Sequence, residues 1–169
     1  MPDATGLELT AQELRDADAE SVLGTDFTRG RATVMVDPER VIGVLGLLRS
    51  KGYTFLASLH GLDYYPEEPR LGVIYELLDM KRVERLTVKA RVGIENPMIP
   101  TAVGVFPGAE FPEREVYDMF GVVFDGHPDL RRILMPEDYE GHPQRRDFPI
   151  GGEPVLFTYN EEQPYGKWQ

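Results

Sequence analysis

The alternation of hydrophobic and polar positions predicts a strand followed by a helix near the start of the chain. Residues 31–36 alternate as a half-buried strand does. Asp37 and Pro38 then supply a helix N-cap and a first helical residue, after which apolar side chains recur at helical spacing up to Leu48. Gly52 follows the last of them, where a helix C-cap is expected.

Three β-rich runs come next, Tyr53–Tyr65, Leu71–Met80 and Val83–Val92, with short connections between them. Their order and spacing predict an antiparallel meander. In the third run polar and apolar residues alternate, which is typical of a sheet that is covered on one face. We therefore expect an α+β fold, with a mixed sheet of about four strands and helices on one face.

The regions before and after this core differ from it in composition and in residue pattern. Residues 1–30 are acidic, and Thr10–Glu20 has a helical pattern, so we expect an N-terminal helical segment there. Residues 31–123 form the expected core domain, which ends with a helix opened by Pro112 and closed by Gly121. From 124 to 169 frequent prolines and glycines exclude long regular elements, whereas interspersed aromatic and aliphatic residues predict an extended tail that binds a partner.

Composition narrows the classes of function. The 169 residues include 18 Lys and Arg against 29 Asp and Glu, which gives a net charge of −11. This acidity disfavours binding of nucleic acid over a broad face, because such binding needs clustered cations. With no cysteine, the chain has no thiolate to hold zinc or an iron–sulfur cluster. The longest apolar run, Val41–Leu48, is too short to span a bilayer, which takes about 20 residues.

The helix after Pro112 contains the first candidate motif. Its charged and terminal residues are Glu113, Arg114, Glu115, Asp118 and Gly121. We expect the glutamates to lie in a first turn that favours anions, and Arg114 to pair with Asp118. Because the two glutamates point in different directions on a helix, an acid/base pair is not expected.

Two further motifs echo one another, each with Gly-His-Pro followed by an arginine pair. The first contains His127, Pro128, Asp129, Arg131 and Arg132, and the second contains His142, Pro143, Arg145, Arg146, Asp147 and Phe148. Arginine pairs suit carboxylates, backbone carbonyls or phosphate. Acidic residues interleave with them, and alternating charge favours salt bridges at a protein interface over a polyanion site.

Two other interpretations remain open at this point. His127, His142 and Asp147 could form a metal site of a small-molecule enzyme, if the fold brings them to one point. The arginine pairs could form a free-standing anion-binding site, if they converge on one exposed pocket.

Taken together, the three motifs resemble those of the C subunit, the thirty-kilodalton subunit, of respiratory complex I. That family has an E-R-E-x-x-D-x-x-G helix, then G-H-P-x-L-x-R-I-L, then G-x-P-x-R-K/R-D-F/Y. The second of these is matched here by Gly126, His127, Pro128, Leu130, Arg132, Ile133 and Leu134. The third begins at Gly141, and Arg146 stands where lysine is common in the family.

The resemblance implies an architectural subunit of the peripheral arm, on the cytoplasmic side of a membrane-bound NADH:quinone oxidoreductase. It implies that the D and B subunits are the direct partners. It also implies that FMN and iron–sulfur clusters are bound by other subunits, with no cofactor on this chain. Arg132 and Arg145 are expected to support assembly and not the internal fold. Similar subunits occur in ferredoxin-dependent quinone reductases and membrane-bound hydrogenases, which stay open as alternatives.

Overall fold

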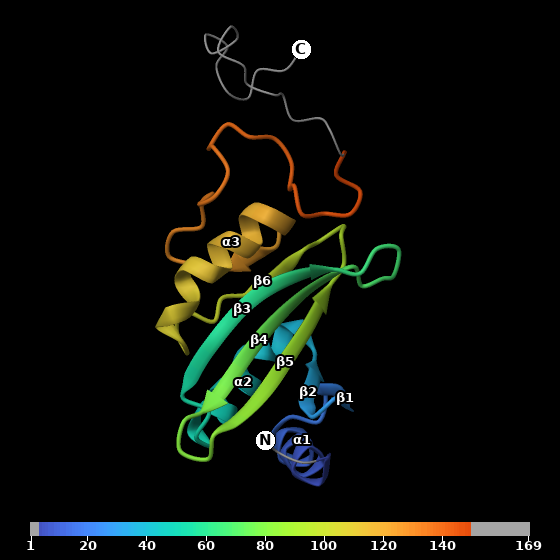
Figure 1. Ribbon diagram of the computed structural model, residues 1–169, viewed down its shortest axis with the longest axis vertical. Coiled ribbons are helices and arrows are strands. Elements are labelled where there is room, and N and C mark those ends of the chain that lie inside the picture. Colours follow the sequence, from blue (N-terminus) through green and yellow to red (C-terminus); the bar gives the residue numbers. More distant parts are fainter. Residues whose placement is uncertain (1–3, 150–169) are drawn as a thin grey trace, which may run out of the picture.

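The computed structural model describes residues 4–149 and builds a five-stranded sheet, a two-stranded sheet and three α-helices from them. Figure 1 shows these elements, which are α1 (Ala4–Ala17), β1 (Val22–Thr28), β2 (Arg31–Val36), α2 (Val41–Ser50), β3 (Phe55–Asp63), β4 (Leu71–Asp79), β5 (Glu84–Val92), β6 (Met98–Pro100), α3 (Glu110–Phe120) and β7 (Val123–Asp125). Short 3₁₀ turns, Pro38–Arg40 and Pro107–Ala109, precede α2 and α3.

The large sheet is mixed and has the strand order β1-β2-β5-β4-β3. Within it only β2 and β5 pair in parallel, and their connection passes through α2 and the meander of β3, β4 and β5. The predicted α+β fold with a mixed sheet is thus confirmed. The sheet has five strands and not about four, because β1 forms a hairpin with β2 within the segment that the sequence indicated as helical.

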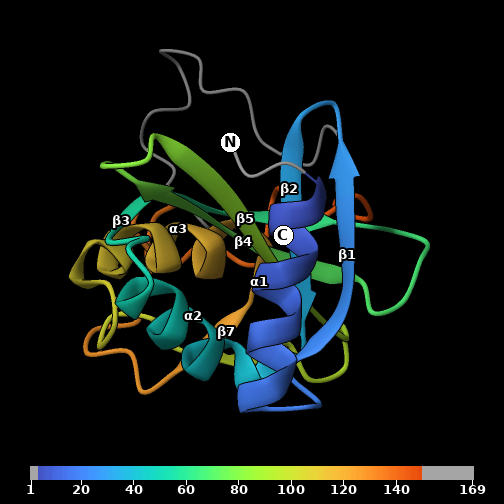
Figure 2. The same ribbon diagram turned by 90° about the horizontal axis from the view of Figure 1, so that it is seen from below.

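The strand β1 was not predicted, because its sequence, VLGTDFT, lacks a regular alternation of apolar and polar residues. Its pairing with β2 includes a register shift between Val22 and Gly24. The helix α1 also belongs to the same core, since Leu7, Ala11 and Leu14 are buried, and α1 lies beside β1 and β2 (Figure 2). Tertiary packing therefore stabilises both elements.

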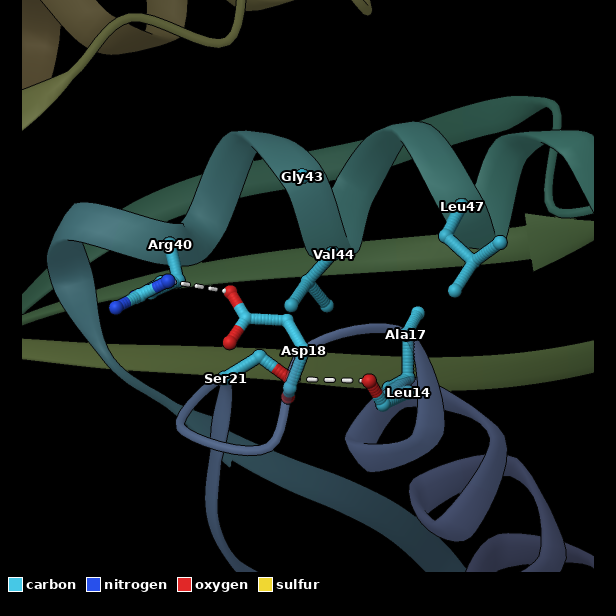
Figure 3. A pocket seen from close by; sticks show the side chains of 8 residues that line it. All are labelled: Leu14, Ala17, Asp18, Ser21, Arg40, Gly43, Val44 and Leu47. Carbon is cyan, nitrogen blue, oxygen red and sulfur yellow. Dashed lines mark hydrogen bonds and ion pairs between the residues drawn. The ribbon is translucent and has the colours of Figure 1, made fainter.

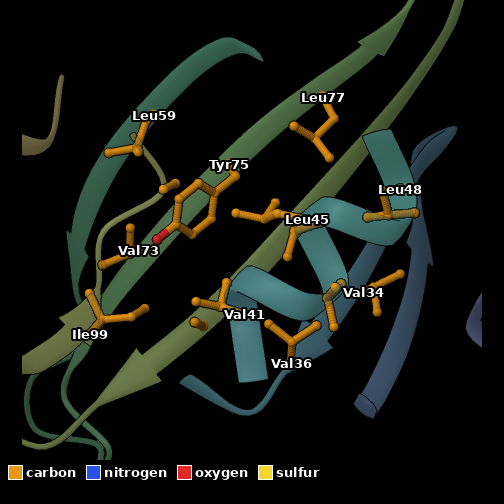
Figure 4. Packing of buried hydrophobic residues seen from close by; sticks show 14 of the residues in the cluster. Val34, Val36, Val41, Leu45, Leu48, Leu59, Val73, Tyr75, Leu77 and Ile99 are labelled. Atoms are coloured by element: carbon orange, nitrogen blue, oxygen red, sulfur yellow. The ribbon is translucent and has the colours of Figure 1, made fainter. Parts of the chain in front are cut away.

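The helices α2 and α3 lie on one side of β3, β4 and β5, as predicted (Figure 2). The strand residues that face them alternate with those that point away, and they are buried almost completely. Figure 4 shows this core, which includes Val34, Val36, Val41, Leu45, Leu48, Leu59, Val73, Tyr75, Leu77 and Ile99. Because α3 packs against β3, the residues of the first motif are anchored to the sheet.

A close approach fixes α3 on β3. A Cβ atom at Gly61 would collide with the Phe120 ring, at 2.7 Å from its Cε2 atom. Glycine is therefore needed at this position for the helix to reach the strand.

A small pocket opens between α1 and α2 (Figure 3). Leu14, Ala17, Gly43 and Leu47 contribute to its lining. The polar groups at its rim bond one another: Arg40 donates to Asp18 at 2.8 Å, and the Ser21 hydroxyl donates to the Leu14 carbonyl at 3.3 Å. We interpret this pocket as a packing gap between the two helices.

Among residues 4–149, none of the helices combines the length and apolar composition that crossing a membrane requires.

Candidate functional site

The helix α3 buries three charged residues, and these organise the candidate site. Glu113 and Asp118 are fully buried, and Arg114 is 9% exposed. Val116, Met119 and Phe120 form the buried apolar stripe of this helix. The helix ends at Gly121, whose positive φ of 76° gives the left-handed C-cap that glycine adopts readily. Buried charges require partners, which the segment after α3 supplies for Arg114 and Asp118 and the loop before α3 supplies for Glu113.

Asp118 binds the chain segment of the second motif. Its Oδ2 atom accepts hydrogen bonds from the backbone N–H groups of Ile133, Leu134 and Met135 at 3.0, 2.7 and 2.8 Å. Its Oδ1 atom accepts from Arg132 at 2.6 Å. Burial acts to raise the pKa of Asp118, but these donors outweigh it and hold the pKa below its ordinary value. A single ionised carboxylate therefore fixes the backbone of three consecutive residues.

Two arginines, Arg114 and Arg132, add hydrogen bonds between α3 and the segment that follows it. Arg114 of α3 donates to the carbonyls of Arg131 and Arg132 at 3.2 and 3.1 Å. Arg132 donates in turn to Asp118 and to the carbonyl of Gly141. The expected pair within the helix, Arg114 with Asp118, was wrong, because each finds its partner in the segment that follows.

The second Gly-His-Pro motif closes the C-terminal end of α3. The carbonyls of Asp118, Met119 and Phe120 lack partners within the helix. A ring nitrogen of His142, Nδ1, lies 3.0 Å from the first, the Gln144 backbone N–H donates to the second at 3.1 Å, and Arg145 donates to the third at 2.6 Å.

His142 and Arg145 also explain why Gly121 is required. A Cβ atom at Gly121 would collide with Arg145 and would lie 2.5 Å from Nε2 of His142. Burial, together with the positive charges of Arg145 and Arg132, lowers the pKa of His142. The neutral ring can donate from Nδ1 to the helix carbonyl. Arg132 and Arg145 therefore have roles in the internal fold, contrary to the expectation that they serve assembly alone.

Asp147 of the third motif is bound by an arginine of the sheet. Arg70 donates to both oxygens of Asp147, at 2.8 and 2.6 Å, and to both oxygens of Asp63, at 2.8 and 2.7 Å. These bonds with Arg70 lower the pKa values of Asp63 and Asp147. Arg146 adds bonds from its backbone N–H to Asp63 and from its side chain to the carbonyl of Tyr65.

Sequence reasoning missed Asp63 and Arg70, which lie at the end of β3 and just before β4. The side chains of both residues are almost fully buried. Burial of an ion pair marks these residues as important, but it can be seen only in the structure.

The first Gly-His-Pro motif packs against the start of α3. Nε2 of His127 lies 3.0 Å from the Glu110 carbonyl, and its Nδ1 atom accepts from the Asp129 backbone N–H at 3.0 Å. These partners define a neutral ring that carries its proton on Nε2. Glu113 accepts from the Thr101 hydroxyl at 2.5 Å and from the Ala102 N–H at 2.7 Å, and burial raises its pKa.

Glu113 lies in the first turn of α3, as expected, and it is completely buried. Glu115 was expected in the same turn but lies beyond it, because the helix begins at Glu110 and not at Pro112. By contrast Glu115 on the same helix is exposed. The loop before α3 returns over the helix and encloses Glu113, which local sequence patterns do not indicate.

The structure does not bring together the residues of the two alternative sites. Within residues 4–149 no group of three histidine or carboxylate side chains is placed to hold a metal ion. His127, His142 and Asp147 instead have the separate partners described above. The arginine pairs likewise diverge: Arg131 pairs with Asp129 at the surface, whereas Arg132, Arg145 and Arg146 bond backbone or carboxylate groups of this chain.

The remaining motif residues complete the segment. Pro128 is exposed and Pro143 half-buried, and each follows a histidine that bonds α3. The Phe148 ring stacks on Tyr139, with their centroids 6.2 Å apart, and lies where a Cβ atom at Gly141 would meet it at 2.7 Å. All three motifs thus hold residues 126–149 against α3 and the sheet.

These features define a class of protein, an α+β domain in which the extended segment that follows α3 is fixed on that helix. The family model described as "Respiratory-chain NADH dehydrogenase, 30 Kd subunit" matches residues 34–154. The chain belongs to this family.

Similar curated proteins span nearly the whole chain. It is 44% identical over 168 residues to the C subunit of the NADH-quinone oxidoreductase of Roseiflexus sp. (strain RS-1), a match that covers 98% of this chain and 94% of the relative. It is 46% identical over 155 residues to the protein of the same name in Roseiflexus castenholzii, with 90% of this chain and 89% of the relative covered.

Solved structures share the fold. A trypsin-resistant fragment of Nqo5 superposes with a TM-score of 0.64 at 33% identity, covering 73% of this chain and 99% of the fragment. A chain of a membrane-bound sulfane sulfur reductase, an archaeal respiratory membrane complex, gives a TM-score of 0.72 at 20% identity, covering 96% and 98% of the two chains. The second likeness concerns the fold alone.

Proposed function

We propose that this chain acts as the C subunit in the hydrophilic peripheral arm of a membrane-bound, proton-translocating NADH:quinone oxidoreductase. The observation that carries the proposal is its 44% identity, over 98% of its length, to a relative of that name. In this role the chain is part of an enzyme complex, in which FMN and iron–sulfur clusters of other subunits pass electrons from NADH to quinone. The assembly holds it at the cytoplasmic side of the membrane.

The part of this chain in the complex is architectural, and the D and B subunits are its direct partners. The geometry of residues 126–149 supports this role. Their backbone is fixed by bonds to α3, while the side chains of Ile133 and Leu134 are 39% and 59% exposed. Apolar side chains on a fixed backbone suit a permanent interface, because little conformational entropy remains to be lost on binding.

Of the three expected parts, residues 1–30, 31–123 and 124–169, the first two fold as one unit, because β1 is an edge strand of the sheet and α1 belongs to the same core. The last part carries the partner-binding surface, and its residues 150–169 lie outside the described part of the chain.

Co-purification from the native host tests the proposal. The full chain with an affinity tag should recover the D and B subunits, along with NADH:quinone oxidoreductase activity. Recovery of the chain alone would contradict it. Recovery of a complex that oxidises ferredoxin or hydrogen, and not NADH, would assign the chain to the alternative complexes.

A pair of matched leucines tests the proposed surface. We expect Leu134→Glu to lower the yield of assembled complex at least tenfold without changing the melting temperature of the isolated chain, because only the exposed side chain changes. Leu9→Glu is the control, since Leu9 on α1 is 63% exposed against 59% for Leu134. Equal assembly of the two variants would contradict binding through this surface.

A further inference from the structure

A second surface lies on the face of the large sheet that points away from α2 and α3. Side chains alternate along each strand, and on β4 and β5 those facing the helices, such as Val73 and Val88, are fully buried. The strand register therefore places Arg31, Arg85, Lys89 and Arg91 together on the opposite face. Four cations share one face of a chain whose net charge is −11.

Two of these cations lie close enough to repel each other. Arg31 and Arg85 immediately precede the paired residues Ala32 and Leu86, so they lie side by side on neighbouring strands. Like charges in such positions destabilise a sheet. Within residues 4–149, Arg31, Arg85 and Lys89 form no ion pair that would offset this repulsion. An arrangement of this kind is typical of a surface that meets a negative partner.

The cations at one end of the face are held in position by Tyr64. Its ring centroid lies 4.4 Å from Nζ of Lys89 and 4.2 Å from the guanidinium carbon of Arg91. Gly72 makes room for the ring, because a Cβ atom there would meet it at 2.6 Å. Side chains that are already ordered lose less entropy on binding.

Apolar side chains lie beside the cationic ones. On β3 and β4, Phe55 pairs with Leu78, and Leu78 pairs with Arg85 of β5. Further along, Ile74 lies next to Lys89. Phe55 is 52% exposed, and Leu62 on the same strand is 39% exposed. The same register places the polar residues Ser58, His60 and Glu76 between these apolar residues, and Ile74 is only 9% exposed. The face therefore presents exposed apolar side chains at the two ends of β3, Phe55 and Leu62, beside a cationic half over β5 and β2.

We propose that this open face binds an amphipathic helix of a partner protein, with apolar residues against Phe55 and Leu62 and an acidic flank against Arg31, Arg85 and Lys89. The four strands β3, β4, β5 and β2 span about 14 Å between their outer axes, since neighbouring strands lie about 4.8 Å apart. A helix is roughly 10 Å wide, so one helix over β4 and β5 reaches the flanking strands with its side chains. The strands β4 and β5, at about 3.3 Å per residue, are roughly 30 Å long and accommodate about 20 helical residues.

The charges favour this occupant over a second copy of the chain, because a copy with the same net charge of −11 is repelled as a whole. The surface is separate from the segment on α3, so it can be tested independently of the proposed function.

Site-specific photo-cross-linking tests the proposal in the native host. The full chain carries p-benzoylphenylalanine at position 55, and cross-linked peptides are identified by mass spectrometry. The expected product is a peptide of another protein with acidic residues beside an apolar stripe of helical spacing. Arg85→Glu together with Lys89→Glu should lower its yield at least tenfold. Reversing the acidic residues of the identified peptide should restore the yield.

Two further variants test whether a lower cross-link yield arises from an unspecific charge change or from loss of folding. Arg15→Glu on α1, away from this face, should leave the yield unchanged. Arg85→Gln with Lys89→Gln removes the repulsion, so it should keep or raise the melting temperature while still lowering the yield. The proposal is overturned by cross-links only to a second copy or to lipid, by a peptide without acidic residues, by a yield insensitive to charge reversal, or by no cross-link.

Discussion

The carboxylate of Asp118 provides the sharpest test of how the C-terminal segment is attached. The Asp118→Asn substitution keeps the shape of the side chain but removes its charge. In the variant, an amide NH₂ group faces the N–H donors that surround the carboxylate in the wild type. Hydrogen bonds to charged groups contribute about 1.5–3 kcal/mol and neutral ones about 0.5–1.5 kcal/mol. Asp118 accepts three backbone bonds and one from Arg132. Weakening these bonds should cost about 3 kcal/mol of attachment free energy.

The effect should be local, because the segment packs on α3 without being part of the sheet core. At about 1.4 kcal/mol per tenfold change, a loss of about 3 kcal/mol raises amide hydrogen exchange roughly 100-fold in Ile133, Leu134 and Met135. Amides of β4 should exchange as in the wild type. The matched control is Asp129→Asn, which alters an exposed pair with Arg131 in the same segment. Equal exchange at residues 133–135 in both variants would refute the reasoning.

The same attachment should depend on pH in a defined direction. Because the folded-state pKa of Asp118 is lowered, its stabilisation is complete above the unfolded value of about 4 and is lost as the pH falls through the folded value. Pepsin should therefore cut residues 131–149 faster as the pH falls below about 4. Cleavage in Asp118→Asn should show a smaller pH dependence over this range.

Three other substitutions test separate parts of the structure. Gly121→Ala should destabilise the isolated chain by at least about 1–2 kcal/mol in urea unfolding, since φ is 76° and the new methyl group collides with neighbours, whereas Gly43→Ala, in open space on α2, should stabilise it by up to about 1 kcal/mol. Because the pKa of Glu113 is raised in the folded state, the wild type should lose stability as the pH rises above 4.5 and through that raised pKa. Glu113→Gln should abolish this loss, and identical profiles of unfolding free energy against pH for the two proteins would contradict the reasoning. Arg70→Lys should release the Asp147 end of the segment, seen as faster tryptic cleavage after position 145 or 146, because lysine cannot bond two carboxylates bidentately; unchanged cleavage would count against this role.

Much of the regular structure could be predicted, because periodicity is a local property. The three strands of the meander and the helix that follows Asp37 lie within a few residues of the expected ranges. The strand β1 was missed since it depends on pairing with β2 and not on its own pattern.

The sequence by itself determined the fold class and, through three ordered motifs, the family. It could not determine what the motif charges bind. Arg70 and Asp147 are 77 residues apart, and Asp118 meets its backbone donors 15 to 17 residues further along the chain. Such partners are chosen by how α3, the sheet and the following segment pack, since buried charges must be paired wherever the fold places them. Only the tertiary structure therefore revealed that these residues fix their own chain before any partner binds.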